Sequence, residues 1–458
     1  MSIRNSLYLA LAVAFGLQLV CAGSASAIAT FTRQYKTECS TCHTIYPELN
    51  EYGEAFLKNS YVYSHKAVAA KSPVKVKDVE SVGAGDSGQV EAAGKEASAG
   101  DVAVPDVQTP PGKDPALWLS AIPEILPISF TATLNLAYDD HAQDKFDLST
   151  RALVLQAGGT FRDKASFYST YTLYSEGNYD PLIKNVPVNN NSDVTELFFI
   201  WRHAFDTPVN VRVGRLKPKL SLWKATNKNT ATSFAPQIYT VGRSLYSIDS
   251  SEDGLEVNSL VGNRVYVAAG VVDRDDQNDK EGYGHISFKI GGSDFRGNEP
   301  EVDLESDSIW DYMGVTVGAY GYYGNNAVTD WGGAPTFNNY YYRTGLDMDL
   351  SYKRLRTRLS GVYGRDSNPF FTTVHDDIRS LVMAAEAEYL IGSDIIAVFR
   401  YEYQDDGTAI HNRLIPAIAY APMQNTKLIL EYKNDHISHI GASSATDNIT
   451  QLALAFSF

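Results

Sequence analysis

Cysteine is scarce in this chain, with three residues among 458. One of them, Cys21, lies in a leader that we expect to be removed from the mature protein. The other two are Cys39 and Cys42. A small fold held together by several disulfides is therefore excluded, and no structural disulfide can involve any other position of the mature chain.

The leader, residues 1–27, has the parts of a secretory signal peptide. Arg4 precedes an apolar run, and Ala25-Ser26-Ala27 then favours cleavage before Ile28. A lipoprotein anchor at Cys21 is the alternative interpretation. It is disfavoured because the residue before that cysteine is a bulky valine where a small residue is usual.

Long apolar runs and excess positive charge are also missing. After the leader, no stretch approaches the ~20 apolar residues of a membrane-spanning helix. Acidic residues outnumber basic ones, 54 to 39, so nucleic-acid binding has no electrostatic support. Tyrosine, in contrast, occurs 29 times, as expected where aromatic girdles lie at membrane interfaces.

The two mature cysteines belong to the pentapeptide Cys39-Ser-Thr-Cys42-His43. A Cys-x-x-Cys-His run predicts c-type haem attachment, in which two thiols bond to the porphyrin and the histidine binds the iron. A thioredoxin-like dithiol would need a βαβ surround that this segment lacks. A zinc knuckle would need further ligands close by, and only His65 is near. The sequence therefore predicts one haem c on Cys39 and Cys42, with His43 as the proximal iron ligand.

Three zones follow the leader. Residues 28–65 carry the pentapeptide and are interpreted as a monohaem cytochrome c domain. Over 66–120 the composition falls to small and polar residues without periodicity, which indicates a flexible linker. Over 127–458 apolar and polar residues alternate with a period of two, which is typical of β-strands.

The alternation predicts sixteen strands. We expect them at 128–139, 146–161, 164–175, 194–205, 209–217, 254–260, 263–273, 283–292, 310–323, 338–352, 354–365, 380–391, 394–404, 411–421, 426–434 and 447–458. A further pairing segment near 235–248 is left open.

The connections between these strands alternate in length. Gly262 and Lys353 mark tight turns, whereas 176–193 and 218–250 are long and polar. Short periplasmic turns alternating with long outer loops are the pattern of outer-membrane barrels. The connection 293–309 departs from this pattern, because it is too long for a periplasmic turn.

The predicted strands have one apolar and one polar face. In 394–404, Phe399 and Tyr401 oppose Arg400 and Glu402. A soluble β-sandwich also alternates, but its outer face would not be this aromatic and its inner face would not be charged. The predicted fold is an all-β transmembrane barrel of about 16 antiparallel strands, with a small α-helical N-terminal c-type cytochrome domain.

The second axial ligand of the haem iron is predicted to be His65. Residues 28–126 contain no methionine, and His65 is the only histidine there besides His43. Three alternatives stay open: an exposed histidine at the start of the linker, ligation by a barrel residue, and five-coordinate iron. Ligation by two histidines would lower the potential relative to histidine and methionine.

The residues around the pentapeptide carry a resemblance to a known family. They are Phe31-Thr-Arg33-Gln34, the pentapeptide itself, Pro47-Glu-Leu49-Asn50, Gly53, Phe56 and Tyr61. Over residues 31–61 the chain resembles the fused monohaem cytochrome–porins of neutrophilic and acidophilic iron-oxidising bacteria. Over the barrel the resemblance extends only to architecture and length.

The resemblance implies an outer-membrane electron-transfer protein and ferrous-iron oxidoreductase. Extracellular Fe(II) would be the electron donor and a periplasmic cytochrome the acceptor, with outer-membrane lipid around the barrel. The cytochrome domain is expected in the barrel lumen or at its periplasmic mouth. Two other functions stay open: electron export to extracellular acceptors, and a diffusion porin with a cytochrome plug.

Three finer expectations concern the barrel and the helix. A helix over 47–57 should begin at Pro47 and pack on the haem through Leu49 and Phe56. A lumen stripe of arginines, Arg354, Arg356 and Arg358, should pair with haem propionates or with Glu48, Glu51 and Glu54. Iron should meet the outer loops, which are expected to hold Asp139-Asp140-His141, Asp376-Asp377, Asp405-Asp406 and Asp435-His436.

Overall fold

A computed structural model gives the structure of the protein. It describes residues 31, 35, 37, 39–62, 128–142, 145–161, 164–175, 193–218, 220–222, 228–248, 250–273, 280–298, 309–329, 336–374, 377–423, 425–439 and 443–457. The predicted signal peptide, the predicted linker and His65 lie outside the described residues.

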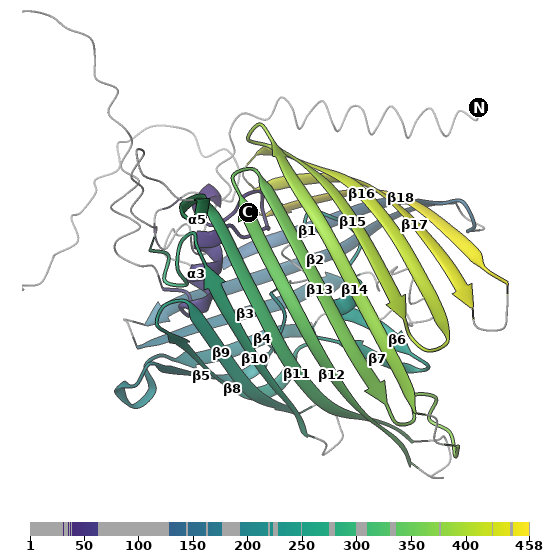
Figure 1. Ribbon diagram of the computed structural model, residues 1–458. Coiled ribbons are helices and arrows are strands. Elements are labelled where there is room, and N and C mark those ends of the chain that lie inside the picture. The colour runs from purple at the N-terminus through teal and green to yellow at the C-terminus, as the bar shows by residue number, and fades with distance from the viewer. Residues whose placement is uncertain are drawn as a thin grey trace, which may run out of the picture.

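In the described part of the chain, sixteen strands close into one antiparallel barrel (Figure 1). Strand β18 pairs with β1, with Thr131 opposite Ser457 and Asp139 opposite Ile449, and this pairing closes the barrel. All sixteen predicted strands are confirmed, with bounds that differ by a few residues. They are β1 (Ile128–Asp139), β2 (Phe146–Phe161), β3 (Ala165–Ser175), β4 (Asp193–Trp201), β5 (Val209–Leu216), β8 (Glu252–Val261), β9 (Val265–Asp273), β10 (Lys280–Ile290), β11 (Met313–Thr329), β12 (Thr336–Tyr352), β13 (Leu355–Asp366), β14 (Ile378–Ile391), β15 (Ile395–Asp405), β16 (Ala409–Met423), β17 (Thr426–His439) and β18 (Ala445–Ser457).

The two faces of the strands are as predicted. On β15, Phe399 and Tyr401 are exposed on the outside, whereas Arg400 and Glu402 are fully buried inside the barrel. The outward apolar side chains continue around the wall, for example at Leu430 on β17. A closed barrel with an apolar outer band and a polar interior is the architecture of outer-membrane proteins.

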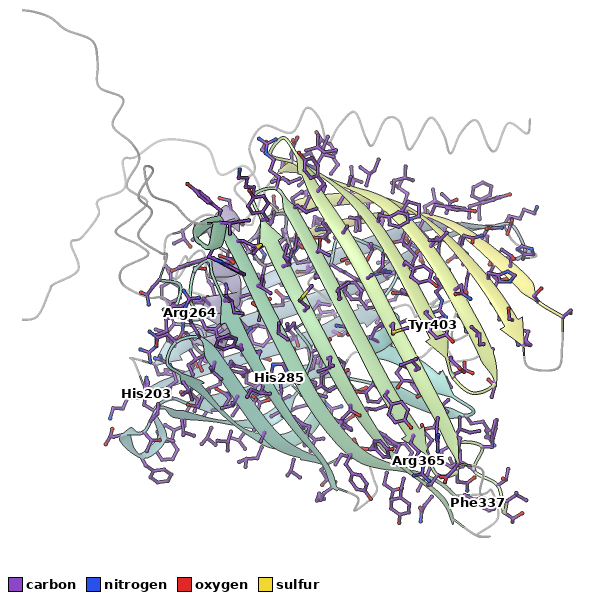
Figure 2. All side chains as sticks on the ribbon, viewed as in Figure 1. His203, Arg264, His285, Phe337, Arg365 and Tyr403 are labelled. Carbon is purple, nitrogen blue, oxygen red and sulfur yellow. The ribbon has the colours of Figure 1, made fainter. Side chains whose placement is uncertain are left out.

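The barrel has a turn end and a loop end. At the turn end, Lys353 and Arg354 join β12 to β13, and residues 392–394 join β14 to β15. The longer connections lie at the opposite, loop end, except for the connection that follows β10. Figure 2 marks Arg264 at the turn end and Arg365 at the loop end.

The predicted outer position of loop 218–250 is wrong for its described residues, because 228–248 fold into the lumen. It joins β5 to β8 and contains a 3-10 helix, η4 (Ala235–Gln237), and a hairpin of β6 (Ile238–Val241) and β7 (Ser244–Ser247), which pair only with each other. The main-chain N–H of Thr232 donates to Glu431 of the wall, and Arg400 donates to the Thr230 hydroxyl. Charged groups on the inner wall thus replace water for this polar segment.

The N-terminal segment lies at the turn end. It contains the 3-10 helix η1 (Cys39–Thr41) and the helix α3 (Glu51–Lys58), and Figure 1 shows α3 beside the short helix α5 (Ile309–Tyr312). The long connection before α5 packs against α3, because Asn59 donates to the Phe295 carbonyl at 3.0 Å. This contact gives a structural role to a connection that is unusually long for the turn end.

The helix of this segment is shorter than predicted. It begins at Glu51 and not at Pro47, because Asn50 is the N-cap and its side chain accepts from the Gly53 N–H at 2.9 Å. Acidic residues in the first turn and Lys58 in the last turn suit the helix dipole.

Candidate functional site

The pentapeptide forms a single tight turn. The main-chain N–H groups of Cys42 and His43 both donate to the Cys39 carbonyl, at 3.1 and 3.0 Å. Residues three and four positions apart therefore lie on one side of the turn. Both cysteines are buried, so one turn holds two thiols and one imidazole together.

His43 is held by the turn that follows it. Its Nδ1 lies 3.2 Å from the Glu48 carbonyl oxygen, and the main chain of His43 forms a bridge with Leu49. A proton on Nδ1 is donated to that carbonyl, which leaves the lone pair of Nε2 available for a metal. Burial lowers the pKa of His43, and this favours the neutral imidazole that metals bind.

Asn50 and Gly53 join the pentapeptide to helix α3. The Asn50 amide donates to the carbonyls of Ser40 and Thr41, at 3.3 and 3.1 Å, while its oxygen caps the helix. Gly53 allows the close approach, because a Cβ there would lie 2.1 Å from the Cys42 carbonyl oxygen. Both residues were part of the family resemblance, but reasoning from the sequence assigned them no role.

Cys42 and His43 line a cavity of about 650 Å³ between the N-terminal segment and the barrel wall. Aromatic rings line the same cavity. Phe31 stacks on Tyr61 with ring centroids 5.2 Å apart, and Tyr61 stacks on Tyr168 of β3 at 5.4 Å. The size is within the ~300–1,000 Å³ that is usual for cofactor and ligand sites.

Phe56 and Leu49, which were predicted to face the cofactor, both line this cavity. Phe56 is buried and makes an edge contact with Phe31, with ring centroids 5.1 Å apart. The contacts of these residues with a haem remain a prediction.

The barrel wall contributes charged groups and a second imidazole to the cavity. His285 of β10, Arg212 of β5 and Lys427 of β17 line it, and Figure 2 marks His285 partway along the barrel. Among the described residues that line the cavity, the histidines are His43 and His285, and no methionine occurs. The sequence analysis assigned these three residues no role, because the alternation within a strand does not show which distant strands meet at one cavity.

The predicted pairing of arginines with the N-terminal segment is confirmed for Glu48. Its carboxylate accepts from Arg356 at 3.0 Å and from Arg358 at 3.3 Å. The inclusion of Arg354 in the stripe is wrong, since that residue is exposed in the turn before β13. The other two predicted acids meet lysines: Lys289 lies 3.2 Å from Glu51, and Lys58 lies 3.4 Å from Glu54.

The acids that were predicted in the outer loops do not all lie in such loops. Asp139, Asp140 and His141 bring their ligand atoms within 4.8 Å of one another at the loop end. Asp435 is wrongly placed by the prediction, because it is buried on β17, where it accepts from Arg413 at 2.9 Å. Strand β17 continues to His439, beyond the predicted end at residue 434, so Asp435 belongs to the strand and its side chain faces the lumen. Asp376 lies outside the described residues.

No helix in the described ranges has the length and apolar character needed to cross a membrane. No protein-family model matches the chain, and no curated protein does. Among solved structures, the chain is similar to the outer membrane channel DcaP of Acinetobacter baumannii, with 10% identity, coverage of 72% of this chain and 96% of that chain, and a TM-score of 0.49. OmpT of Vibrio cholerae has 8% identity, coverage of 72% and 97%, and a TM-score of 0.48. For OprB of Pseudomonas putida the values are 10%, 72% and 93%, and 0.42.

These likenesses concern the fold alone. The closed pairing of this chain's own strands, with an apolar band outside and charges inside, defines the class of protein: a sixteen-stranded porin-like barrel of the outer-membrane type.

Proposed function

We propose that the protein carries electrons at an outer membrane through one haem c. In this proposal, Cys39 and Cys42 bind the porphyrin and His43 binds the iron. The observation that carries the proposal is the position of the pentapeptide: Cys42 and His43 line an aromatic cavity inside a barrel of the outer-membrane type.

The residues of the cavity fit a haem. Both thiols are buried in one turn, and the Nδ1 contact of His43 leaves its other nitrogen for iron. The rings of Phe56 and Tyr61 would pack on the porphyrin and exclude water. A bound haem would supply a one-electron couple, and these residues would hold it and shape its surroundings.

The geometry supports electron transfer over free diffusion of solutes. Residues 39–62 and the inserted loop, including 228–248, make hydrogen bonds and ion pairs to the inner wall. Together they fill part of the lumen that an open diffusion channel would need. The diffusion porin is compatible with the fold, but it gives no reason to place the thiol of Cys42 and the imidazole of His43 in one cavity.

The position at the turn end supports an electron-transfer partner on the periplasmic side. In barrels of this type the short turns face the periplasm, so a haem held by His43 would lie close to a periplasmic acceptor. One electron would pass from extracellular Fe(II), which becomes Fe(III), to a periplasmic cytochrome. Outward electron export would use the same groups, and the midpoint potential of the haem distinguishes it from iron oxidation.

The test begins with the Cys39→Ala/Cys42→Ala protein in outer membranes. We expect loss of covalent haem staining, while heat-modifiable migration of the folded barrel persists. In intact cells that express the parent, Fe(II) added outside should reduce the haem, and the midpoint potential of the purified protein should allow that step. Retained stain in the variant would refute the site, and a parent haem that Fe(II) cannot reduce would refute iron oxidation.

A further inference from the structure

The carboxylate of Glu48 is the junction of three parts of the molecule. It is almost fully buried. One oxygen accepts from Arg356 and Arg358 of β13, at 3.0 and 3.3 Å. The other accepts from the Asn229 amide of the inserted loop, at 2.8 Å. The N-terminal segment, the barrel wall and the loop thus meet at one residue.

The main chain of the same residue holds His43. The Glu48 carbonyl oxygen lies 3.2 Å from His43 Nδ1 and accepts the Thr44 N–H at 3.1 Å. Arg356 also donates to the next carbonyl, that of Leu49, at 3.0 Å. The carbonyl that orients the imidazole therefore belongs to a turn that is bound to the wall twice. Its Glu48 side chain and its Leu49 main-chain carbonyl both accept from Arg356.

We propose that Glu48 is a positioning residue through which strand β13 orients His43 and sets the potential of the haem. This inference rests on the proposed function, because it requires iron on His43. Partners of this kind fix the tautomer of a ligating histidine and raise its basicity, and their loss usually weakens metal binding about 10–100-fold.

The direction of the effect follows from the bond to Nδ1. Donation from Nδ1–H to a fixed carbonyl makes Nε2 a better electron donor, which favours ferric over ferrous iron. If the Glu48 turn loosens, the imidazole becomes a poorer donor and the midpoint potential rises. We expect a rise both when Glu48 is changed and when its wall partner Arg356 is changed.

Simple electrostatics predicts a different pair of results. Removal of a carboxylate near the haem raises the potential, and removal of a guanidinium lowers it. Glu48→Gln and Arg356→Gln would then shift the potential in opposite directions. The sign of the potential shift in Arg356→Gln therefore distinguishes a positioning role of this residue from the direct electrostatic effect of its charge on the haem.

Matched controls are available on the same elements. Glu54→Gln removes a carboxylate that lines the cavity but pairs with Lys58 within its own helix. Arg354→Gln removes an exposed guanidinium two residues before Arg356. Arg356→Lys keeps the charge and loses the forked geometry, so it should give a shift between those of the parent and Arg356→Gln.

The experiment measures the midpoint potential and the ferric EPR spectrum of the purified full-length variants. A rise in both Glu48→Gln and Arg356→Gln, with altered EPR signals and unchanged controls, supports the inference. Opposite shifts, or parent values in both variants, overturn it. If the parent itself carries no covalent haem, the proposed function fails first. Barrel folding is followed separately by heat-modifiable migration. If Arg356→Gln does not fold, the midpoint potential of Arg356→Lys is measured in its place.

Discussion

Replacement of Gly53 by alanine tests whether helix α3 must lie directly against the pentapeptide. The added Cβ would lie 2.1 Å from the Cys42 carbonyl oxygen and 2.9 Å from Leu49 Cδ2. A carbon–oxygen contact normally needs about 3.3 Å, so helix and turn must separate by about 1.2 Å. The carbonyl is main chain and accepts the Asn50 N–H at 2.9 Å, so it cannot move alone.

Overpacking of this kind costs about 1–3 kcal/mol. The cost falls on the contact that holds Cys42 and His43 in place, because α3 and the pentapeptide are joined there. We expect Gly53→Ala to lower the denaturant concentration at which the haem absorption band is lost. The far-UV circular dichroism of the barrel should keep the parent's transition, since no strand is touched.

The matched control is Gly282→Ala on β10, where an added Cβ would meet no atom within 4 Å. That variant should behave as the parent. If Gly53→Ala also loses its haem band at the parent's denaturant concentration, the close approach of α3 to the pentapeptide is not as described.

Three further predictions concern the same segment. Asn50→Ala removes the helix cap and should destabilise the segment by about 0.5–2 kcal/mol, measured by the same haem-band titration. Phe56→Ala removes a buried ring and should cost about 3–5 kcal/mol, seen as faster loss of the native haem spectrum on heating. The third concerns pH. Burial alone would raise the pKa of Glu51, but Lys289 and hydrogen bonds from Ser293 outweigh it and hold that pKa below its usual 4.5. The stabilisation is thus complete above pH 4.5 and lost as pH falls through the lowered pKa, so acid should release the segment, and Glu51→Gln should weaken this dependence.

Each of these predictions has its control. Thr44→Ala, at an exposed side chain of the same turn, and Phe146→Ala, at an exposed ring, should leave haem stability near the parent's. Glu54→Gln should keep the acid dependence of the parent. Equal stability of Asn50→Ala and Thr44→Ala would refute the cap. A Glu51→Gln protein with the parent's acid release would show that other groups govern it.

The order of the residues along the chain determined the strands and the pentapeptide. The alternation of Phe399, Arg400, Tyr401 and Glu402 specifies which side faces lipid, because successive side chains of a strand point to opposite faces. All sixteen strands were predictable for that reason. The Cys-x-x-Cys-His spacing likewise depends only on neighbours, since one turn of chain brings Cys39, Cys42 and His43 together.

The position of the inserted loop was decided only by the tertiary structure. Its polar residues, such as Asn229, Thr230 and Thr232, suit water and a charged lumen equally well. In the closed barrel they meet Glu431 and Arg400 instead of solvent. Composition therefore could not tell an outer loop from a lumen segment, because the inner wall offers the same hydrogen-bond partners that water does.

The partners of the segment's carboxylates were decided in the same way. The sequence predicted that Glu48, Glu51 and Glu54 could all pair with the arginines of one strand, and of these three acids only Glu48 does so. Glu54 pairs with Lys58 one helical turn later, while Glu51 reaches Lys289 on β10. Residues hundreds of positions apart meet because the closed barrel brings distant strands to the N-terminal segment, within which Gly53 and Asn50 hold helix α3 against the pentapeptide.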